Sequence, residues 1–289
     1  MVLLSPTRFP DYELIDCGDF EKLERFGKYI TIRPEPQAVW SKKLSHLEWQ
    51  KTAHVKFFQI GSNSGDWQKM KEIPDRWNIK YKLGKSELQF RLAVTSFKHV
   101  GIFPEQAVNW DYISETFSLM KVKEPKFLNL FAYTGAASLA AKAAGADVTH
   151  LDSIKQVVTW ARENMEVSGL KDIRWIVEDA LKFVKREVKR GKKYHGIILD
   201  PPAYGNGPDG EKWKLEDNIE EMMQNVFQLL DEKNHFLILN VYSMGFSSLI
   251  IENLLKGFAK EKLETGELFL PSKTDFKLPL GVFGRFRSI

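Results

Sequence analysis

The spacing of apolar and polar residues divides the chain into two parts. From Lys126 onward, apolar segments of strand length alternate with amphipathic segments of helix length. In residues 154–165 the apolar positions recur at helical spacing, and Gly169 follows as a stop signal. This alternation predicts an α/β fold, with a parallel sheet covered by helices on both faces. Residues 262–272 and 281–289 follow one another without a helix and predict a terminal antiparallel hairpin on that sheet.

The part before this alternation consists of short strand-like segments and turns. Period-two alternation of apolar and polar residues in 81–94, with Gly84 at the turn, predicts a β-hairpin. Residues 41–53 are polar and predict either a short helix or an extended arm, and residues 96–117 read as a connector that leads into a helix. We therefore expect a small β-rich N-terminal domain over residues 1–95 and an α/β domain over residues 96–289.

Composition limits the class of protein and its compartment. Of the 289 residues, 43% are hydrophobic and 28% are charged, which is typical of a globular protein. The single cysteine, Cys17, excludes an internal disulfide and a four-cysteine zinc site, and it suits a reducing compartment. No apolar run has the length of a membrane span, the start lacks signal-peptide features, and the six histidines lack metal-ligand spacing. We expect a cytoplasmic protein with no membrane partner and no metal site.

The formal net charge of +4 is unevenly distributed along the chain. Residues 40–91 contain eleven Lys and Arg against five Asp and Glu, whereas residues 96–289 contain 26 of each. This asymmetry favours an anionic partner such as RNA, although a solvated lysine-rich face would give the same pattern. Trp40 and Trp49 lie among these lysines, where they could stack on bases or belong to the core of a small domain. The basic run 182–193 most simply solvates a helix.

Four predicted strands end in residues that suit a nucleoside. Ligands of doubly wound sheets bind outside the carboxyl ends of the strands. There, Gly135 allows close approach of the backbone, Asp152 could accept both hydroxyls of a ribose, and Asp179 with the Ala180 amide could meet an adenine edge. An aspartate after a strand is more often a helix cap, and a glycine is more often a plain turn. Four strand ends in the right order make that reading less probable.

The first of these turns has one glycine rather than the G-x-G-x-x-G of dinucleotide folds. This argues against a pyrophosphate on the following helix and disfavours an NAD-dependent oxidoreductase. The fourth strand end reads "ILDPPAYG". Two prolines fix φ and remove two backbone donors, so neither a helix nor a sheet ladder continues through them. We expect a rigid, exposed bend that holds Asp200 and Tyr204.

Residues 97–289 resemble the class I S-adenosylmethionine-dependent methyltransferases, and in pattern the ribosomal RNA large-subunit methyltransferases. The resemblance lies in "GIFPEQ" (101–106), "LNLFAYTGAASLAAKAAGADVTHLD" (128–152), "VEDAL" (177–181) and "ILDPPAYGNGPDGEKW" (198–213). It implies a Rossmann-like, doubly wound, mostly parallel seven-stranded sheet and S-adenosyl-L-methionine as cofactor. The implied cofactor-binding residues are Phe103, Gln106, Asn129, Phe131, Ala132, Tyr133, Thr134, Gly135, Ala136, Asp152, Ser153, Asp179, Ala180 and Asp200. The implied catalytic residues are Asp200, Pro201, Pro202 and Tyr204.

In this scheme Asp200 and the Pro201 carbonyl accept an amine of the acceptor base, and Tyr204 stacks on that base. Relatives that methylate carbon five of cytosine use a cysteine after the fifth strand. This chain has Tyr242 and Ser243 there, and Cys17 lies in the other domain, so a nitrogen or oxygen acceptor is preferred.

The sequence thus predicts an RNA methyltransferase, with ribosomal RNA as the first candidate substrate and the β-rich domain holding the RNA. Two alternatives remain open. Absent RNA binding by residues 1–95 would favour a small-molecule methyltransferase, and absent cofactor turnover would indicate a non-catalytic RNA-binding assembly factor. The sequence does not indicate the oligomeric state.

Overall fold

The computed structural model describes residues 1–61, 64–242, 245–259 and 263–289, and it forms two compact units. The large unit comprises Met1–Leu4, Val108–Leu268 and Gly281–Ile289. The small unit comprises Ser5–Ala107 and Phe269–Leu280.

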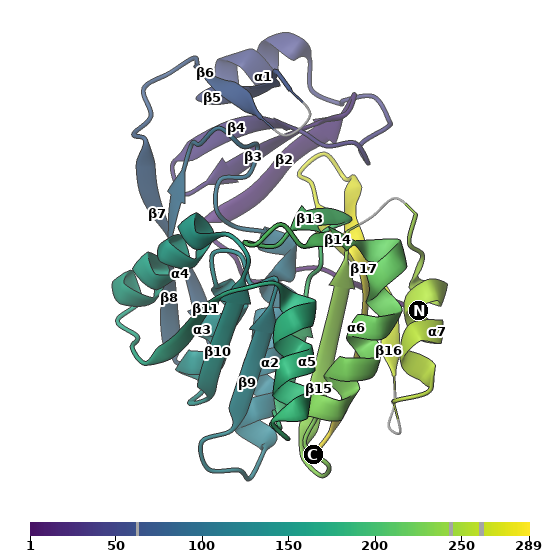
Figure 1. The fold of residues 1–289 in the computed structure, drawn as a ribbon. Helices are drawn as coiled ribbons and strands as arrows, with labels where there is room; N and C mark the ends of the chain where they lie inside the picture. Colours follow the sequence, from purple (N-terminus) through teal and green to yellow (C-terminus); the bar gives the residue numbers. More distant parts are fainter. Residues whose placement is uncertain (62–63, 243–244, 260–262) are drawn as a thin grey trace. The chain divides into compact units, whose positions relative to one another are not determined.

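Eight strands form the sheet of the large unit, in the order β1-β16-β17-β15-β12-β9-β10-β11 (Figure 1). Their bounds are β1 (Val2–Leu4), β16 (Glu264–Pro271), β17 (Lys277–Ser288), β15 (His235–Val241), β12 (Gly196–Leu199), β9 (Lys126–Leu130), β10 (Asp147–Asp152) and β11 (Ile173–Val177). The strands from β15 to β11 are parallel, and β17 is antiparallel to β15. The predicted α/β fold with a mostly parallel sheet is confirmed.

The sheet has eight strands rather than the seven that the resemblance implies. The additional strand is β1, which pairs in parallel with Gly266–Leu268 of β16 at the sheet edge. A three-residue strand is too short to produce a readable alternation of apolar and polar positions, so the sequence pattern did not indicate it.

Helices cover both faces of this sheet. Their bounds are α2 (Ala107–Leu119), α3 (Ala136–Ala143), α4 (Lys155–Val167), α5 (Ala180–Lys189), α6 (Leu215–Leu229) and α7 (Ser248–Lys256). In Figure 1, α5 and α6 lie in front of the sheet and α2 lies behind it. On the front face, Phe183 of α5 and Met222 of α6 share one buried cluster with sheet residues such as Leu199. On the back face, Phe117 of α2 contacts Phe127 of β9 at 5.8 Å between ring centroids.

The predicted helix after the second strand begins later than its apolar stripe suggested. Ile154, the first member of that stripe, is the N-cap residue of α4 and is 52% exposed. Val158, Ala161 and Met165 are buried, so the rest of the stripe faces the core as predicted.

The small unit contains two sheets and one α-helix. Its elements are β2 (Tyr12–Gly18), β3 (Glu21–Phe26), β4 (Tyr29–Pro34), α1 (His46–Thr52), β5 (Val55–Gln59), β6 (Gly65–Lys69), β7 (Arg76–Leu83), β8 (Ser86–Ala93) and the 3-10 turn η1 (Pro104–Gln106). Strands β2 to β6 form a five-stranded sheet, and β7 with β8 forms a two-stranded ribbon. The hairpin predicted at residues 81–94 is therefore confirmed, and residues 41–53 contain a helix, which Ser45 and Glu48 cap reciprocally.

Polar groups buried in the small unit have partners from well beyond residue 95. The Asp16 carboxylate, which is fully buried, accepts hydrogen bonds from the Trp49 indole at 2.9 Å and from the Thr274 hydroxyl at 2.6 Å. The buried Arg33 guanidinium donates to Glu24 at 2.8 Å and to the Lys98 carbonyl at 3.2 Å. These long-range contacts explain why the small unit extends to Ala107 and includes residues 269–280, beyond the boundary expected at residue 95.

No helix in the described part of the chain is long and apolar enough to cross a membrane. Within those same residues, no group of three or more acidic, histidine or cysteine side chains has the arrangement of a metal site.

Candidate functional site

The register of the parallel sheet brings the predicted strand ends into one row. Leu130 of β9 is paired with Leu199 of β12 and with Leu151 of β10, and Leu199 is also paired with Leu239 of β15. The next residues along these strands are Phe131, Asp200, Asp152 and Asn240. Because adjacent strands lie about 4.8 Å apart, these residues are neighbours at the carboxyl edge of the large unit's sheet.

The strand order reverses at this edge. From β9 the chain proceeds to β10 and β11 on one side, and then to β12 and β15 on the other. A doubly wound sheet has its crevice at such a switch point. The switch lies between β9 and β12, so Phe131 and Asp200 flank it.

The first loop, residues 131–135, has a strained backbone. Phe131, Tyr133 and Gly135 have φ angles of +55°, +48° and +88°. Positive φ is uncommon outside glycine, and it is found repeatedly at functional sites where the surroundings enforce it. Two aromatic residues in this conformation within three positions mark the loop as a candidate binding element.

Neighbouring strands and helices enforce the conformation of this loop. The Ala132 N–H donates to the Leu151 carbonyl at 3.0 Å, and the Tyr133 N–H donates to Asp152 Oδ2 at 2.8 Å. The buried Thr134 offers its carbonyl to Asn164 Nδ2 of α4 at 3.0 Å. The loop is therefore fixed before any ligand arrives.

Asp152 is half-buried and is held by two backbone donors. Its Oδ2 accepts from Tyr133, and its Oδ1 accepts from the Ile154 N–H at 3.0 Å. Burial raises the pKa of this carboxyl above its ordinary value, and the backbone N–H donors partly oppose that rise. A carboxylate has about four lone-pair sites, so both oxygens retain capacity for a further donor such as a ribose hydroxyl.

Asp179 is the N-cap of α5, in agreement with the alternative that an aspartate after a strand caps the following helix. Its Oδ1 accepts from the Lys182 N–H at 2.8 Å. Ala180 is the first residue of the helix, where a backbone N–H has no intrahelical partner. Capping occupies part of the Asp179 carboxylate and leaves the Ala180 amide as a candidate donor to a base edge.

The fourth loop contains Asp200, Pro201, Pro202 and Tyr204. Strand β12 ends at Leu199, as the two prolines predict, and regular structure resumes after four intervening residues in a ribbon of β13 (Tyr204–Asn206) and β14 (Lys212–Lys214). Asp200 is half-buried, and burial raises its pKa to about 6. The Tyr204 side chain is 68% exposed.

Trp213 of β14 fixes this loop, a role that the sequence pattern did not indicate. Its indole N–H donates to the Pro202 carbonyl at 2.7 Å. Its ring is buried against Phe131 of the first loop, with 4.8 Å between ring centroids. Trp213 thus connects the first and fourth loops, and the fixed geometry attributed to the prolines also depends on it. The tryptophan lies eleven residues beyond Pro202, and nothing in that spacing indicated the contact.

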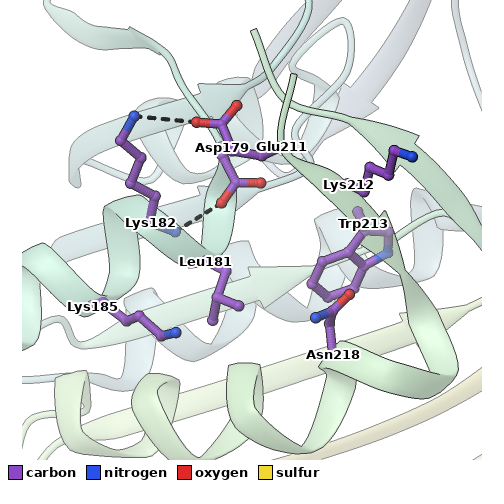
Figure 2. A pocket seen from close by; sticks show the side chains of 8 residues that line it. All are labelled: Asp179, Leu181, Lys182, Lys185, Glu211, Lys212, Trp213 and Asn218. Carbon is purple, nitrogen blue, oxygen red and sulfur yellow. Dashed lines mark hydrogen bonds and ion pairs between the residues drawn. The ribbon is translucent and has the colours of Figure 1, made fainter. Parts of the chain in front are cut away.

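An open pocket of about 300 Å³ lies beside the fourth loop (Figure 2). It is lined by Asp179, Leu181, Lys182, Lys185, Glu211, Lys212, Trp213 and Asn218. Lys182 binds Glu211 at 3.2 Å, as Figure 2 shows. It also binds Asp209 at 3.1 Å, so the first turn of α5 is attached to the turn between β13 and β14. The pocket therefore lies between Asp179, at the N-terminus of α5, and the fourth loop. The adenine of the cofactor is predicted to bind beside Asp179.

Asn129 is buried and bonded within the core, and its contact with a cofactor stays a prediction. Its Nδ2 donates to the Ser138 hydroxyl at 2.9 Å, and that hydroxyl contacts His150 Nδ1 at 3.0 Å. All three residues are buried, and burial lowers the pKa of His150 to about 3. This series of buried contacts supports the first loop from inside the core. It agrees with the expectation that His150 is packed rather than catalytic.

The remaining predicted site residues lie in three places. Ala136 begins α3, and Ser153 lies between β10 and α4, so both belong to the carboxyl edge of the sheet. Phe103 and Gln106 belong to the small unit, at η1, and their contact with a cofactor stays a prediction. Ser243 lies outside the described residues.

Asn240 is a further residue that the sequence analysis did not single out. It is 2% exposed and follows Leu239, the β15 residue that is paired with Leu199 of β12. Its Oδ1 accepts a hydrogen bond from Asn109 Nδ2 at 3.2 Å. A polar residue within the apolar strand "HFLILNV" was the available signal.

Comparisons with known proteins agree with this geometry. The family described as Conserved hypothetical protein 95 matches residues 111–240. The Ribosomal RNA large subunit methyltransferase K/L of Shewanella frigidimarina is 29% identical over 260 residues, which are 81% of this chain and 34% of that protein. The chain therefore spans about a third of the length of this curated relative.

Two solved structures have similar folds. The structure of SMU.776, described as a methyltransferase complexed with SAH, aligns with a TM-score of 0.73 at 17% identity, covering 96% of this chain and 76% of that one. The crystal structure of the SAM-dependent methyltransferase from Agrobacterium tumefaciens aligns with a TM-score of 0.92 at 36% identity, covering 100% of this chain and 94% of that one. With this identity over nearly the whole length of both proteins, the chain belongs to the SAM-dependent methyltransferases.

Proposed function

We propose that this protein transfers a methyl group from S-adenosylmethionine to a base nitrogen of RNA, with ribosomal RNA as the substrate. The observation that carries the proposal is the fourth loop, which begins at the switch point with half-buried Asp200, whose pKa is raised, and which also contains exposed Tyr204. The proposed catalytic residues are Asp200, Pro201, Pro202 and Tyr204.

The residues at the carboxyl edge fit the cofactor. Asp152 presents two carboxylate oxygens, which suit the two ribose hydroxyls. The strained loop 131–135 presents backbone to the methionine part, and the α5 N-terminus presents the Ala180 amide to the adenine. The cofactor supplies an activated methyl group on sulfur, so the protein's task is chiefly to align the acceptor and exclude water.

The fourth loop suits an amine acceptor. Ionised Asp200 and the Pro201 carbonyl can accept hydrogen bonds from an amino group, and exposed Tyr204 can stack on the base that carries it. A covalent route through a thiol is disfavoured, because Cys17 is fully buried and its pKa is raised to about 12 by that burial.

The proposal of RNA as substrate rests on the curated relatives and on charge. Those relatives are named for ribosomal RNA of the large subunit, and this chain matches at most about a third of their length. The excess of cations in residues 40–91 lies within the small unit. We therefore propose that the small unit binds the RNA while the large unit carries the chemistry.

Methylation of ribosomal RNA provides the test. Ribosomal RNA from a strain that lacks this gene is incubated with the purified protein and radiolabelled S-adenosylmethionine, and the modified nucleotide is located by mass spectrometry. We expect label on a base nitrogen of one nucleotide, and no label with the Asp200→Ala variant. Label that appears only on small molecules from a cell extract would support the small-molecule alternative. Cofactor binding without any turnover would support the assembly-factor alternative.

A further inference from the structure

The ribbon formed by β7 and β8 has one apolar face and one basic face. Along β7, buried residues alternate strictly with exposed ones. The buried face is anchored inside the small unit, where the Trp77 indole donates to the Phe26 carbonyl at 3.2 Å and Tyr81 contacts Phe9 with 5.0 Å between ring centroids. The ribbon is therefore held firmly by one face while the other meets solvent.

Cations dominate the outward-facing positions. Residues 76–93 contain five Lys and Arg and a single acidic residue, Glu87, so the ribbon has a net charge of +4. This equals the formal net charge of the whole chain. The outward-facing basic residues of this face are Arg76, Lys80, Lys82 and Arg91, and the amides Asn78 and Gln89 accompany them. Exposed Lys85 lies in the turn between the two strands.

In the other basic segments of the chain, several cations are paired with carboxylates. On α5, Lys185 pairs with Glu221 at 2.6 Å and Arg190 pairs with Glu187 at 3.1 Å. In the small unit, Lys42 and Lys56 both pair with Glu21, at 2.5 and 2.7 Å. A cation already paired with a carboxylate gains less from a phosphate, because the existing pair must first be broken.

The lysine-rich segment around Trp40 and Trp49 is therefore a weaker candidate than its sequence suggested. Trp49 is 1% exposed and belongs to the core of the small unit, with Lys42 Nζ 4.1 Å from the centroid of its ring. The Trp40 indole donates to the Cys17 carbonyl at 3.0 Å. Trp49 is thus a core residue, as the alternative interpretation stated, and Trp40 is only partly buried but holds a structural hydrogen bond.

On the ribbon, by contrast, the single acidic side chain pairs with one lysine. Glu87 binds Lys80 at 2.7 Å, and both side chains are about half exposed. Within the described residues, Lys82 and Lys85 have no carboxylate within ion-pair distance. Alternate residues of a strand lie about 6.8 Å apart, so Lys80 and Lys82 begin a linear array of cations rather than a compact cluster.

We propose that the outward face of the β7–β8 ribbon is the surface through which this protein binds the phosphate backbone of RNA. The inference rests on the proposed function, because it takes RNA as the substrate, and it adds the surface and the contacting groups. A linear array of cations suits a polymer that carries a charge on every unit. Phosphate contacts position the RNA without reading its sequence, which leaves recognition of the base to the large unit.

The test compares two triple variants of the full-length protein. In the ribbon variant, Lys80, Lys82 and Lys85 are replaced by Gln. In the control variant, Lys171, Lys189 and Lys192 are replaced by Gln, which gives the same change of charge on exposed residues of the large unit. Binding of a labelled single-stranded RNA of ribosomal sequence is measured over a range of salt concentrations. Binding of S-adenosylmethionine and the thermal midpoint are measured alongside.

We expect the slope of log affinity against log salt to fall by about 2 in the ribbon variant, since each contact with a single strand contributes about 0.7. Between about 50 and 200 mM salt, the ribbon variant should therefore lose roughly 15- to 20-fold less affinity than the parent protein. The control variant should keep the parent's slope, and both variants should bind S-adenosylmethionine normally.

Three outcomes would overturn the inference. If the ribbon variant keeps the parent's slope while the parent methylates RNA, the surface is wrong and the proposed function stands. If the parent binds S-adenosylmethionine but shows no salt-dependent RNA binding, the proposed substrate fails as well. If polyglutamate binds the ribbon and RNA does not, the surface takes an acidic protein partner instead.

Discussion

Asp200 illustrates how burial can set the working range of a single residue. Burial raises its pKa to about 6, so the carboxyl is neutral below that pH and ionised above it. The ionised form is the one that accepts a hydrogen bond or a proton from an amine. In the free protein, kcat/KM for methylation should therefore rise as the pH increases through about 6 and level off above it.

Asp200→Asn should remove this rise and lower the rate strongly, while the affinity for S-adenosylmethionine changes little. Stability provides a second measurement. Because the folded state favours the protonated form, the contribution of Asp200 to the free energy of unfolding should decrease as the pH rises from about 4 to about 6. A parent protein whose kcat/KM is flat across this range would show that Asp200 only shapes the loop.

Asp152 should contribute affinity for the cofactor rather than rate. Two charge-assisted hydrogen bonds to ribose hydroxyls are worth about 1.5–3 kcal/mol each, so Asp152→Ala should weaken binding of S-adenosylmethionine at least about a hundredfold. Titration calorimetry measures this loss. Asp147→Ala changes an exposed aspartate at the other end of the same strand and serves as the matched control. Equal affinities in the two variants would contradict the ribose assignment.

At the scale of elements, the first loop also sets the packing of α3 against α4. A Cβ atom at Gly135 would lie 3.0 Å from the Ala161 Cβ, and the residue has a φ of +88°. Gly145 ends the same helix with a φ of +89°, but a Cβ there would meet no atom within 4 Å. Both glycines therefore need a left-handed backbone conformation, but only at Gly135 would an added Cβ atom also press against a neighbouring side chain.

Gly145→Ala should lower the free energy of unfolding by about 1–2 kcal/mol through the left-handed conformation alone. Gly135→Ala should lower it by that amount and by about 1 kcal/mol more, because a tightly packed helix interface yields little. Denaturant titration measures the free energy of unfolding of both variants, and the difference between their losses gives the cost of the contact with Ala161. Equal losses would show that Gly135 serves only the turn.

The pattern of the sequence predicted most of the large unit's architecture and the positions of its site. Strand and helix order follows from hydrophobic periodicity, which is a local property, and Asp152 and Asp200 lie at strand ends as a consequence. The clamp from Trp213 to Pro202, the support of Thr134 by Asn164, and the pairing of β1 with β16 depend on contacts between distant parts of the chain. Periodicity contains no information about such contacts.

The same limit applies to the boundary between the units. The change of pattern near residue 95 marks where β-rich sequence ends, but the small unit continues to Ala107 and includes residues 269–280. The partner of Asp16 that comes from the C-terminal hairpin is 258 residues away in sequence. A boundary drawn from local composition cannot include it.

The composition of the small unit predicts how fragments of this chain should behave. A fragment of residues 1–95 lacks the Lys98 carbonyl that accepts from buried Arg33, the Val100 carbonyl that accepts from Ala93, and the Thr274 hydroxyl that donates to buried Asp16. Each buried group left without its partner costs about 1–3 kcal/mol, a large share of the roughly 5–15 kcal/mol that stabilises a typical domain.

We therefore expect residues 1–95 alone to unfold without a cooperative transition. Residues 5–107 joined by a flexible linker to residues 269–280 should instead melt cooperatively, because that fragment restores all three partners. Circular dichroism during heating distinguishes the two, and Thr274→Val in the joined fragment should lower its midpoint by removing one of the restored bonds. Cooperative melting of residues 1–95 at the same temperature as the joined fragment would show that the later segments add nothing to the stability of the small unit.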